Sequence, residues 1–246
     1  MATTITPPRA SAPKRAPMDS LRKTAFWAGV LYLISFVSIP TLILYGPVKE
    51  AGYIAGAGPD TGVLFGGVLE LIVGLAGIGT AVVLYKVLKR QNQAAALGLV
   101  GSRVLEGALI FAGVASILTV VALRQAGVGT DGLVTGQALV GLYDKTFLVS
   151  QSLIPAVNAL LLGSLLYKSR LVPRVLPVLG LIGAPLLIAG TIGTVFGAWE
   201  PASTQTMILT LPIATWEFSL GIYLIVKGFR PSGLARLDLA PAVAGA

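Results

Sequence analysis

Four charged residues stand inside otherwise apolar stretches of the sequence. Glu70, Arg103, Glu106 and Glu217 each lie near the middle of a run long enough to cross a lipid bilayer. A charged side chain at bilayer depth costs about 2.5–3.5 kcal/mol on insertion scales, and such residues usually face the interior of a helix bundle. At a rise of about 1.5 Å per residue, all four fall within about 8 Å of the membrane midplane. They could therefore meet at one level, and we take them as a candidate site for an ion or a polar substrate.

The charges of these four residues do not balance, because three glutamates face one arginine. Arg103 and Glu106 are i,i+3 neighbours on a helix and can pair directly. An isolated buried carboxylate becomes neutral rather than remain charged. We therefore predict that at least one of Glu70, Glu106 and Glu217 is protonated near neutral pH or binds a cation. One interpretation of the cluster is functional: it is a proton or cation relay, or a polar substrate pocket around Arg103. The other is structural: it is a hydrogen-bonded network that only fixes helix register.

A second set of polar residues repeats every seven positions along one apolar run. Asp144, Gln151 and Asn158 form this polar stripe, which passes Pro155. Asp144 and Lys145 lie nearer the outer surface, where they can offset each other's charge or reach water. Taken alone, Gln151 and Asn158 are predicted to form hydrogen bonds between helices.

Several kinds of chemistry are excluded by composition. The sequence has no cysteine and no histidine, so disulfides, thiol nucleophiles and histidine-ligated haem or zinc are absent. Ser–His and Cys–His catalytic pairs are absent for the same reason. No phosphate-binding loop of the G-x-x-x-x-G-K-[ST] type occurs. We expect no cofactor, no resident metal and no recognisable catalytic residue.

The elements that must position these side chains are membrane-spanning helices. Of 246 residues, 55% are hydrophobic and 11% are charged, whereas a soluble domain carries about 25% charged residues. A span needs about 20 apolar residues, so an all-α integral membrane bundle of six transmembrane helices accounts for residues 21–229 as one domain. A disordered basic tail is expected over residues 1–20 and a second tail over 230–246. The predicted spans are residues 25–45, 62–88, 94–123, a segment within 138–167, 176–199 and 206–226.

The basic residues fix the expected orientation of the bundle. Fourteen of the 18 lysines and arginines fall on one side, whereas the opposite loops hold only Lys49 and Arg124. Cytoplasmic loops carry the excess of positive charge, so we expect both termini in the cytoplasm and the protein in a plasma membrane. The net charge of +8 reflects this bias rather than a nucleic-acid partner, and the basic loops would contact anionic lipid. The fourteen are Arg9, Lys14, Arg15, Arg22, Lys23, Lys86, Lys89, Arg90, Lys168, Arg170, Arg174, Lys227, Arg230 and Arg236.

Several stretches resemble the bacterial membrane family called domain of unknown function 4386, over about residues 22–229. This resemblance implies a six-helix bacterial membrane protein. It brings no known activity, substrate or cofactor, so no functional residue is carried over from it. The stretches are GVLYL at 29–33, the run 79–110 with SRVLE at 102–106, NALLLG at 158–163, residues 167–174, LGLIG at 179–183, and residues 216–229, which begin with Trp216 and Glu217.

Three classes of function remain open. The first is a small proton- or cation-linked transporter with a site near the midplane, as transporters often have. The second is a non-catalytic membrane scaffold or envelope sensor, in which the buried polar network is structural. The third is an intramembrane enzyme that uses carboxylates with Mg²⁺, and it ranks last because no catalytic motif is present. Six helices are few for a transporter, so a homodimer is a further expectation.

Overall fold

The computed structural model describes residues 20–200 and 203–239, and every regular element in these ranges is helical. Six segments are long and apolar enough to cross a membrane. The prediction of an all-α bundle with six spans is therefore confirmed for the described part of the chain. The tail predicted over residues 1–20 lies, apart from Ser20, outside that part, as do residues 240–246.

The six spans match the predicted segments to within a few residues at most ends. Short helices α3 (Gly46–Lys49), η2 (Tyr53–Ala55) and η3 (Gly129–Gly132) connect them, and α10 (Pro231–Leu239) follows the last span. The fourth span begins earlier than predicted. The spans consist of α1 (Ser20–Ile34) with η1 (Ser35–Ser38) and α2 (Thr41–Leu44), α4 (Thr61–Leu88), α5 (Gln93–Gln125), α6 (Leu133–Leu148) with η4 (Val149–Leu153) and α7 (Ile154–Ser169), α8 (Val175–Val195), and α9 (Thr204–Val226).

Two of the spans are interrupted, which the sequence reading did not predict. The first changes to a 3₁₀ turn before Pro40, because proline lacks an N–H group and its ring clashes with the carbonyl four residues earlier. The Ser35 hydroxyl donates to the Tyr32 carbonyl, and the Thr41 hydroxyl donates to the Ser38 carbonyl, at 2.6 and 2.7 Å. The fourth span contains the π-helical turn η4 immediately before Pro155. A π-helical turn adds one residue to a helical turn and rotates everything that follows.

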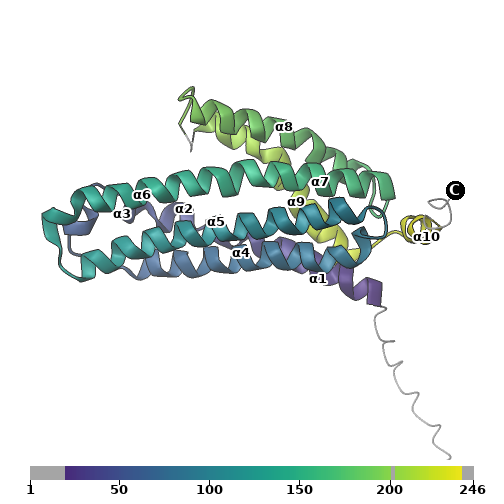
Figure 1. Cartoon of the computed structure of the whole chain (residues 1–246), viewed down its shortest axis with the longest axis horizontal. Coiled ribbons are helices and arrows are strands. Elements are labelled where there is room, and N and C mark those ends of the chain that lie inside the picture. Colours follow the sequence, from purple (N-terminus) through teal and green to yellow (C-terminus); the bar gives the residue numbers. More distant parts are fainter. Residues whose placement is uncertain (1–19, 201–202, 240–246) are drawn as a thin grey trace, which may run out of the picture.

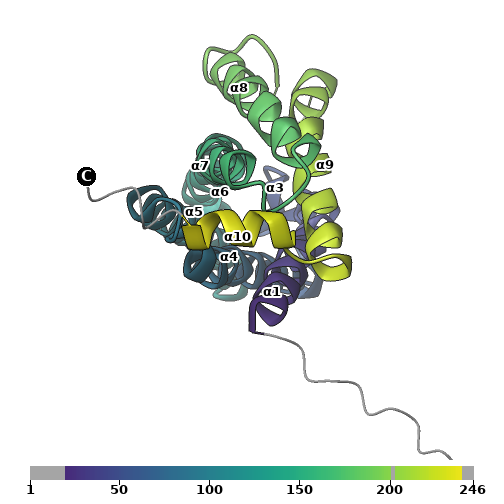
Figure 2. The ribbon, with the colours of Figure 1, turned by 90° about the vertical axis from the view of Figure 1, so that its right-hand side faces the viewer.

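The six spans form a closed ring. Each span packs against the next along the chain, and α9 returns to pack against α1 (Figure 2). The ring closes where two glycines face each other: a Cβ on Gly29 would lie 2.5 Å from the Gly221 carbonyl oxygen. Small residues at a crossing let helix backbones approach closely in a membrane. The closed ring leaves an interior toward which α1, α4, α5, α7 and α9 can all direct side chains.

The two ends of the ring are closed by different means. The described N-terminal and C-terminal segments meet at one end, where α10 lies across the bundle (Figures 1 and 2). There Leu237 is buried in the larger apolar cluster, and Arg90 pairs with Asp238 at 2.9 Å. At the other end a smaller cluster around Tyr45, Ile117 and Tyr143 is covered by α3, η2 and η3.

A partly buried ion pair joins the helices at this second end. Asp60, immediately before α4, pairs with Arg124 at the end of α5 at 2.7 Å. The same Asp60 oxygen accepts the Tyr53 hydroxyl at 2.6 Å, and the other accepts Gln125 Nε2 at 2.9 Å. The Tyr53 hydrogen bond, reinforced by Gln125 and Arg124, holds the pKa of Asp60 below its ordinary value. The four side chains therefore tie α4, α5 and η2 together.

The lowered pKa of Asp60 predicts how stability depends on pH. Its contribution is fully present above the unfolded-state pKa, about 3.9, and is lost as pH falls through the lower folded-state pKa. Asp60→Asn should therefore unfold at a lower temperature than wild type at pH 7, and the difference should close below about pH 4. Thermal unfolding of the purified protein between pH 7 and 3 measures this. A difference that stays constant over that range would show that Asp60 does not act through its charge.

Candidate functional site

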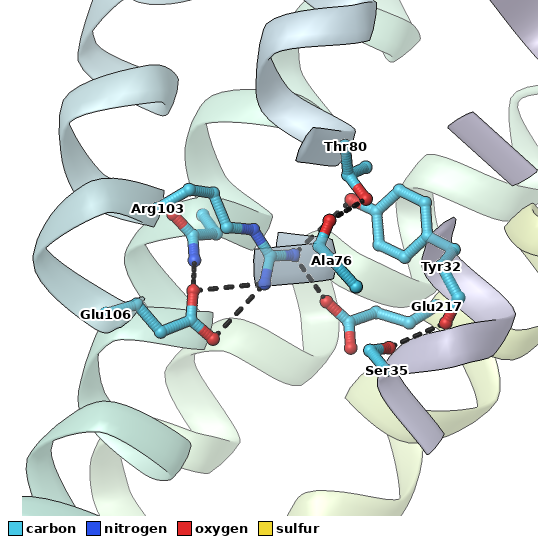
Figure 3. Close-up of polar contacts among 8 residues, drawn as sticks. Tyr32, Ser35, Ala76, Thr80, Arg103, Glu106 and Glu217 are labelled. Carbon is cyan, nitrogen blue, oxygen red and sulfur yellow. Dashed lines mark hydrogen bonds and ion pairs between the residues drawn. The ribbon is translucent and has the colours of Figure 1, made fainter. Parts of the chain in front are cut away.

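One guanidinium group in the ring interior binds two carboxylates from different helices. Arg103 Nη1 lies 3.0 Å from Glu106 Oε2 and 3.2 Å from Glu106 Oε1, and Arg103 Nη2 lies 2.9 Å from Glu217 Oε1 (Figure 3). The three side chains expose only 7%, 8% and 15% of their surface. Their protein contacts are therefore charge-assisted hydrogen bonds in surroundings with little water, where such bonds are strongest.

The positions of these residues on their helices bring them together. Arg103 and Glu106 lie one turn apart on α5, so their side chains share one face of that helix. Glu217 comes from α9, which is not a neighbour of α5 in the ring. Gly77 of α4 lies against this long side chain, since a Cβ there would meet Arg103 at an ordinary van der Waals distance of 3.8 Å. The arginine therefore reaches across the interior to connect the third and sixth spans.

Two neighbouring side chains complete the surroundings of Arg103. Tyr32 of α1 lies with its ring centroid 5.7 Å from the guanidinium carbon and its hydroxyl 3.5 Å from Nη2, a favourable but long contact. Asn158 of α7 donates from Nδ2 to Glu106 Oε2 at 2.7 Å. The site therefore takes residues from the first, third, fourth and sixth spans.

The two carboxylates are held unequally. Glu106 accepts from Arg103 at both oxygens and from Asn158 at one of them. Glu217 accepts from Arg103 at Oε1, and no described group donates to its other oxygen. Its side chain is also more exposed than that of Glu106. With all three groups ionised the site carries a net charge of −1, and Glu217 is the carboxylate with fewer protein donors.

Glu70 does not join this cluster, so the prediction of one common level for all four charges is wrong. Its carboxylate accepts the Tyr143 hydroxyl at 2.7 Å, and the Thr41 side chain faces it from α2. Glu70 precedes Gly77 by seven residues, or about 10 Å along α4, which displaces it toward the end covered by α3 and η2. The same offset follows from counting along the hairpin, because Glu70 lies 18 residues before the end of α4 at Leu88, whereas Arg103 lies 10 residues after the start of α5 at Gln93.

The predicted polar stripe is also divided by the structure. Asp144 pairs with Lys49 of α3 at 2.7 Å, rather than with Lys145. Gln151 lies within η4, and only Asn158 reaches the arginine site. The π-helical turn separates residues that seven-residue spacing would place on one face of a regular helix.

Several aromatic residues of the interior were missed by sequence reasoning. Tyr32, Tyr45 and Tyr143 are all buried, although tyrosine in a span is typically read as an interfacial residue. A usable signal existed for Tyr32, which follows Gly29 by three residues and so shares its inward face. The described part of the chain also contains two buried polar atoms without hydrogen-bond partners near the centre, Asn158 Oδ1 and Trp216 Nε1.

The carboxylates of the interior are too dispersed to form a recognisable metal site. Among the described residues, no group of three or more His, Cys, Asp or Glu side chains could hold a metal ion. Arg103 occupies the space between Glu106 and Glu217 and supplies the positive charge that a cation would otherwise bring.

These features define a polytopic helical membrane protein with an ion-paired cluster inside its bundle. The family model described as Domain of unknown function (DUF4386) matches residues 27–228. The chain belongs to this family, which confirms the resemblance seen in the sequence. Neither a curated protein nor a solved structure matches the chain.

Removal of Arg103 should destabilise the protein because it leaves the carboxylates of Glu106 and Glu217 without a positively charged partner. Breaking a buried ion pair by removing one partner costs about 3–5 kcal/mol, so Arg103→Ala should lower the unfolding free energy by about that amount. Adding Glu106→Gln and Glu217→Gln should recover more than half of the loss, because the uncompensated charges are then gone. Denaturant unfolding of the purified variants measures both effects.

Lys145→Ala provides the control for loss of a positive charge on an exposed position of the fourth span. It should change the unfolding free energy by no more than about 0.5 kcal/mol. If the triple variant were as unstable as Arg103→Ala alone, the charge imbalance would not be the source of the destabilisation.

Proposed function

We propose that the protein is a small proton- or cation-linked carrier of the bacterial plasma membrane, with Glu217 as the carboxylate that exchanges the proton. The observation that carries this proposal is the single positive charge of Arg103 between the buried carboxylate of Glu106 and the partly buried carboxylate of Glu217. One carboxylate is balanced by the arginine, and the other has no second cation among the described residues. A buried uncompensated carboxylate takes up a proton rather than remain charged.

The hydrogen bonds assign the two roles. Glu106 accepts donors at both oxygens, and an acceptor-only arrangement suits the ionised form. Glu217 has an oxygen that accepts no described donor and the larger exposure of the two. Glu106 would therefore stay ionised and hold Arg103, while Glu217 gains and loses the proton. Neutralising Glu217 would weaken its bond to Arg103 and with it the connection between α5 and α9.

The distribution of charge supports an orientation with both termini in the cytoplasm. The described termini lie at the same end of the bundle (Figure 1), where the loops carry most of the basic residues. Arg22 donates to the carbonyls of Leu224, Ile225 and Val226 at the end of α9 there. The remaining basic side chains at this end would face the anionic lipid of the cytoplasmic leaflet. A homodimer in the membrane remains part of the proposal.

The alternative is a membrane scaffold or envelope sensor whose polar network is structural. The dense hydrogen bonding of Glu106 favours it, because a buried hydrogen-bonded network can fix helix packing without exchanging protons. The two functions differ in what neutralising Glu217 does. A carrier would lose flux, whereas a scaffold would change only in stability.

Proton uptake by reconstituted vesicles tests the proposal. Wild-type protein in liposomes with an internal pH dye should take up protons faster than protein-free liposomes when a membrane potential, inside negative, is imposed. Glu217→Gln should reduce the protein-dependent rate by about a hundredfold, to background, as expected for a lost proton-transfer group. Glu200→Gln, at an exposed position between α8 and α9, is the matched control and should keep the wild-type rate.

Circular dichroism and size-exclusion elution establish that Glu217→Gln is folded. Wild-type uptake equal to that of protein-free liposomes would reject the carrier. So would a folded Glu217→Gln variant with the wild-type rate.

A further inference from the structure

A cavity at the end of the bundle opposite α10 is separate from the arginine site. It has a volume of about 190 Å³ and lies between α3, η2 and α6. One water molecule needs about 10–15 Å³ of such volume, so the cavity has room for a small organic molecule. Its walls are mainly apolar, with Ile54, Val120, Leu133 and Val140 among them, and charged side chains line one part.

The charged side chains give this cavity a negative balance. Lys49, Glu50 and Asp144 line it, and with all three ionised they sum to −1. The Lys49 ammonium is already paired with Asp144, which leaves the charge of Glu50 to set the balance. A cavity of this size with apolar walls and a net negative charge favours a small organic cation over an anion or a neutral solute.

The position of the Lys49 ammonium shows that the Asp144 carboxylate of this cavity can hold an ammonium group. Its Nζ lies 2.7 Å from Asp144 Oδ1 and 5.2 Å from the centroid of the Tyr143 ring. A carboxylate beside an aromatic ring is a common way to bind an ammonium group. The Lys49 ammonium therefore occupies a cation position between Asp144, which lines the cavity, and the ring of Tyr143, which is buried next to it.

The ion pair between Lys49 and Asp144 is weak enough for another cation to displace Lys49. The side chains of Lys49 and Asp144 are 44% and 42% exposed, and ion pairs at this exposure contribute little to stability because water and salt screen them. Lys49 sits at the end of the four-residue helix α3, so its side chain can swing into water without disturbing a span. A competing ammonium would then take its place against Asp144 and Tyr143.

We propose that this cavity binds a small organic ammonium ion at the Asp144 carboxylate, in the place that the Lys49 ammonium occupies in the structure, so that Lys49 competes with the ligand. The alkyl part of the ligand lies against the apolar walls, and its ammonium group replaces the Lys49 Nζ. Tyr143 also donates its hydroxyl to Glu70 at 2.7 Å, so the ligand lies one side chain away from a buried carboxylate. The binding proposal does not depend on the carrier function, because it concerns a different end of the bundle and is tested by binding alone.

Calorimetric titration of n-butylammonium chloride into the full chain in phosphatidylglycerol nanodiscs tests this site. Wild type should show saturable binding that n-butanol at the same concentration does not reproduce. Lys49→Ala should bind about fivefold more tightly, because an exposed ion pair and a cation–π contact no longer compete. Asp144→Asn should lose the binding, and Asp144→Glu, which keeps the charge, should retain it.

Two charge-matched variants serve as controls. Lys145→Ala removes a neighbouring lysine and Asp131→Asn an exposed aspartate of η3, and neither residue lines the cavity. Both should bind as wild type does. Unchanged binding by folded Asp144→Asn would overturn the proposal, and so would weaker binding by Lys49→Ala, which would indicate an anion site. Should Asp144→Asn fail to fold, the Lys49→Ala comparison still decides between these outcomes.

The ammonium group could belong to a free solute or to the headgroup of phosphatidylethanolamine. Repeating the titration in nanodiscs that contain this lipid separates the two sources. Binding that is weaker there than in phosphatidylglycerol, and only in proteins with an acidic residue at position 144, assigns the site to the lipid headgroup. Equal binding in both kinds of nanodisc assigns it to a free solute. Either result supports an ammonium site at Asp144.

Discussion

The arrangement of the helices depends on one interaction, in which two carboxylates from different spans form ion pairs with the guanidinium group of Arg103. Arg103 and Glu106 belong to α5, and Glu217 belongs to α9 across the ring. Buried ion pairs give little net stability, because desolvation of the charges offsets most of the attraction between them. What this arrangement supplies is a fixed relation between helices that do not otherwise pack together, and a charge balance that changes with one proton. The closing contact between Gly29 and Gly221 keeps α9 close enough for that relation to hold.

The polar features of the interior are arranged in series along the bundle rather than gathered in one pocket. A large apolar cluster lies on the side of α10, the arginine site follows, and Glu70 with Tyr143 lies about 10 Å further on. The cavity lined by Lys49 and Asp144 comes last, at the opposite end. Groups that can hold a proton or a cation therefore reach from the centre of the bundle to one end, while apolar side chains close the other.

Most of the fold could be predicted from the sequence, because lipid leaves few alternatives to apolar helices of about 20 residues. The number of spans and the placement of Arg103 beside Glu106 follow from composition and from spacing on one helix. The partnership of Arg103 with Glu217 could not be predicted in the same way, because it depends on which helices adjoin. The separation of Glu70 follows from counting residues on either side of the connection between α4 and α5. The interruptions at Pro40 and Pro155 are intermediate cases. Proline marks both places, but only the structure shows that the turn before Pro155 is π-helical and divides Asp144, Gln151 and Asn158.

Infrared difference spectroscopy of the protein in nanodiscs tests the central claim most directly. The carbonyl-stretch band of protonated carboxyl groups would be followed across neutral pH in wild type and in Glu70→Gln, Glu106→Gln and Glu217→Gln. Arg103 can balance only one of its two partners, so the account predicts a band that appears and disappears with pH in wild type. That band should be missing in Glu217→Gln and retained in Glu70→Gln. In Glu106→Gln it should move to lower pH, because Arg103 then balances Glu217 alone. A spectrum in which every glutamate keeps one protonation state throughout would contradict the account, and would identify the cluster as a sealed structural network.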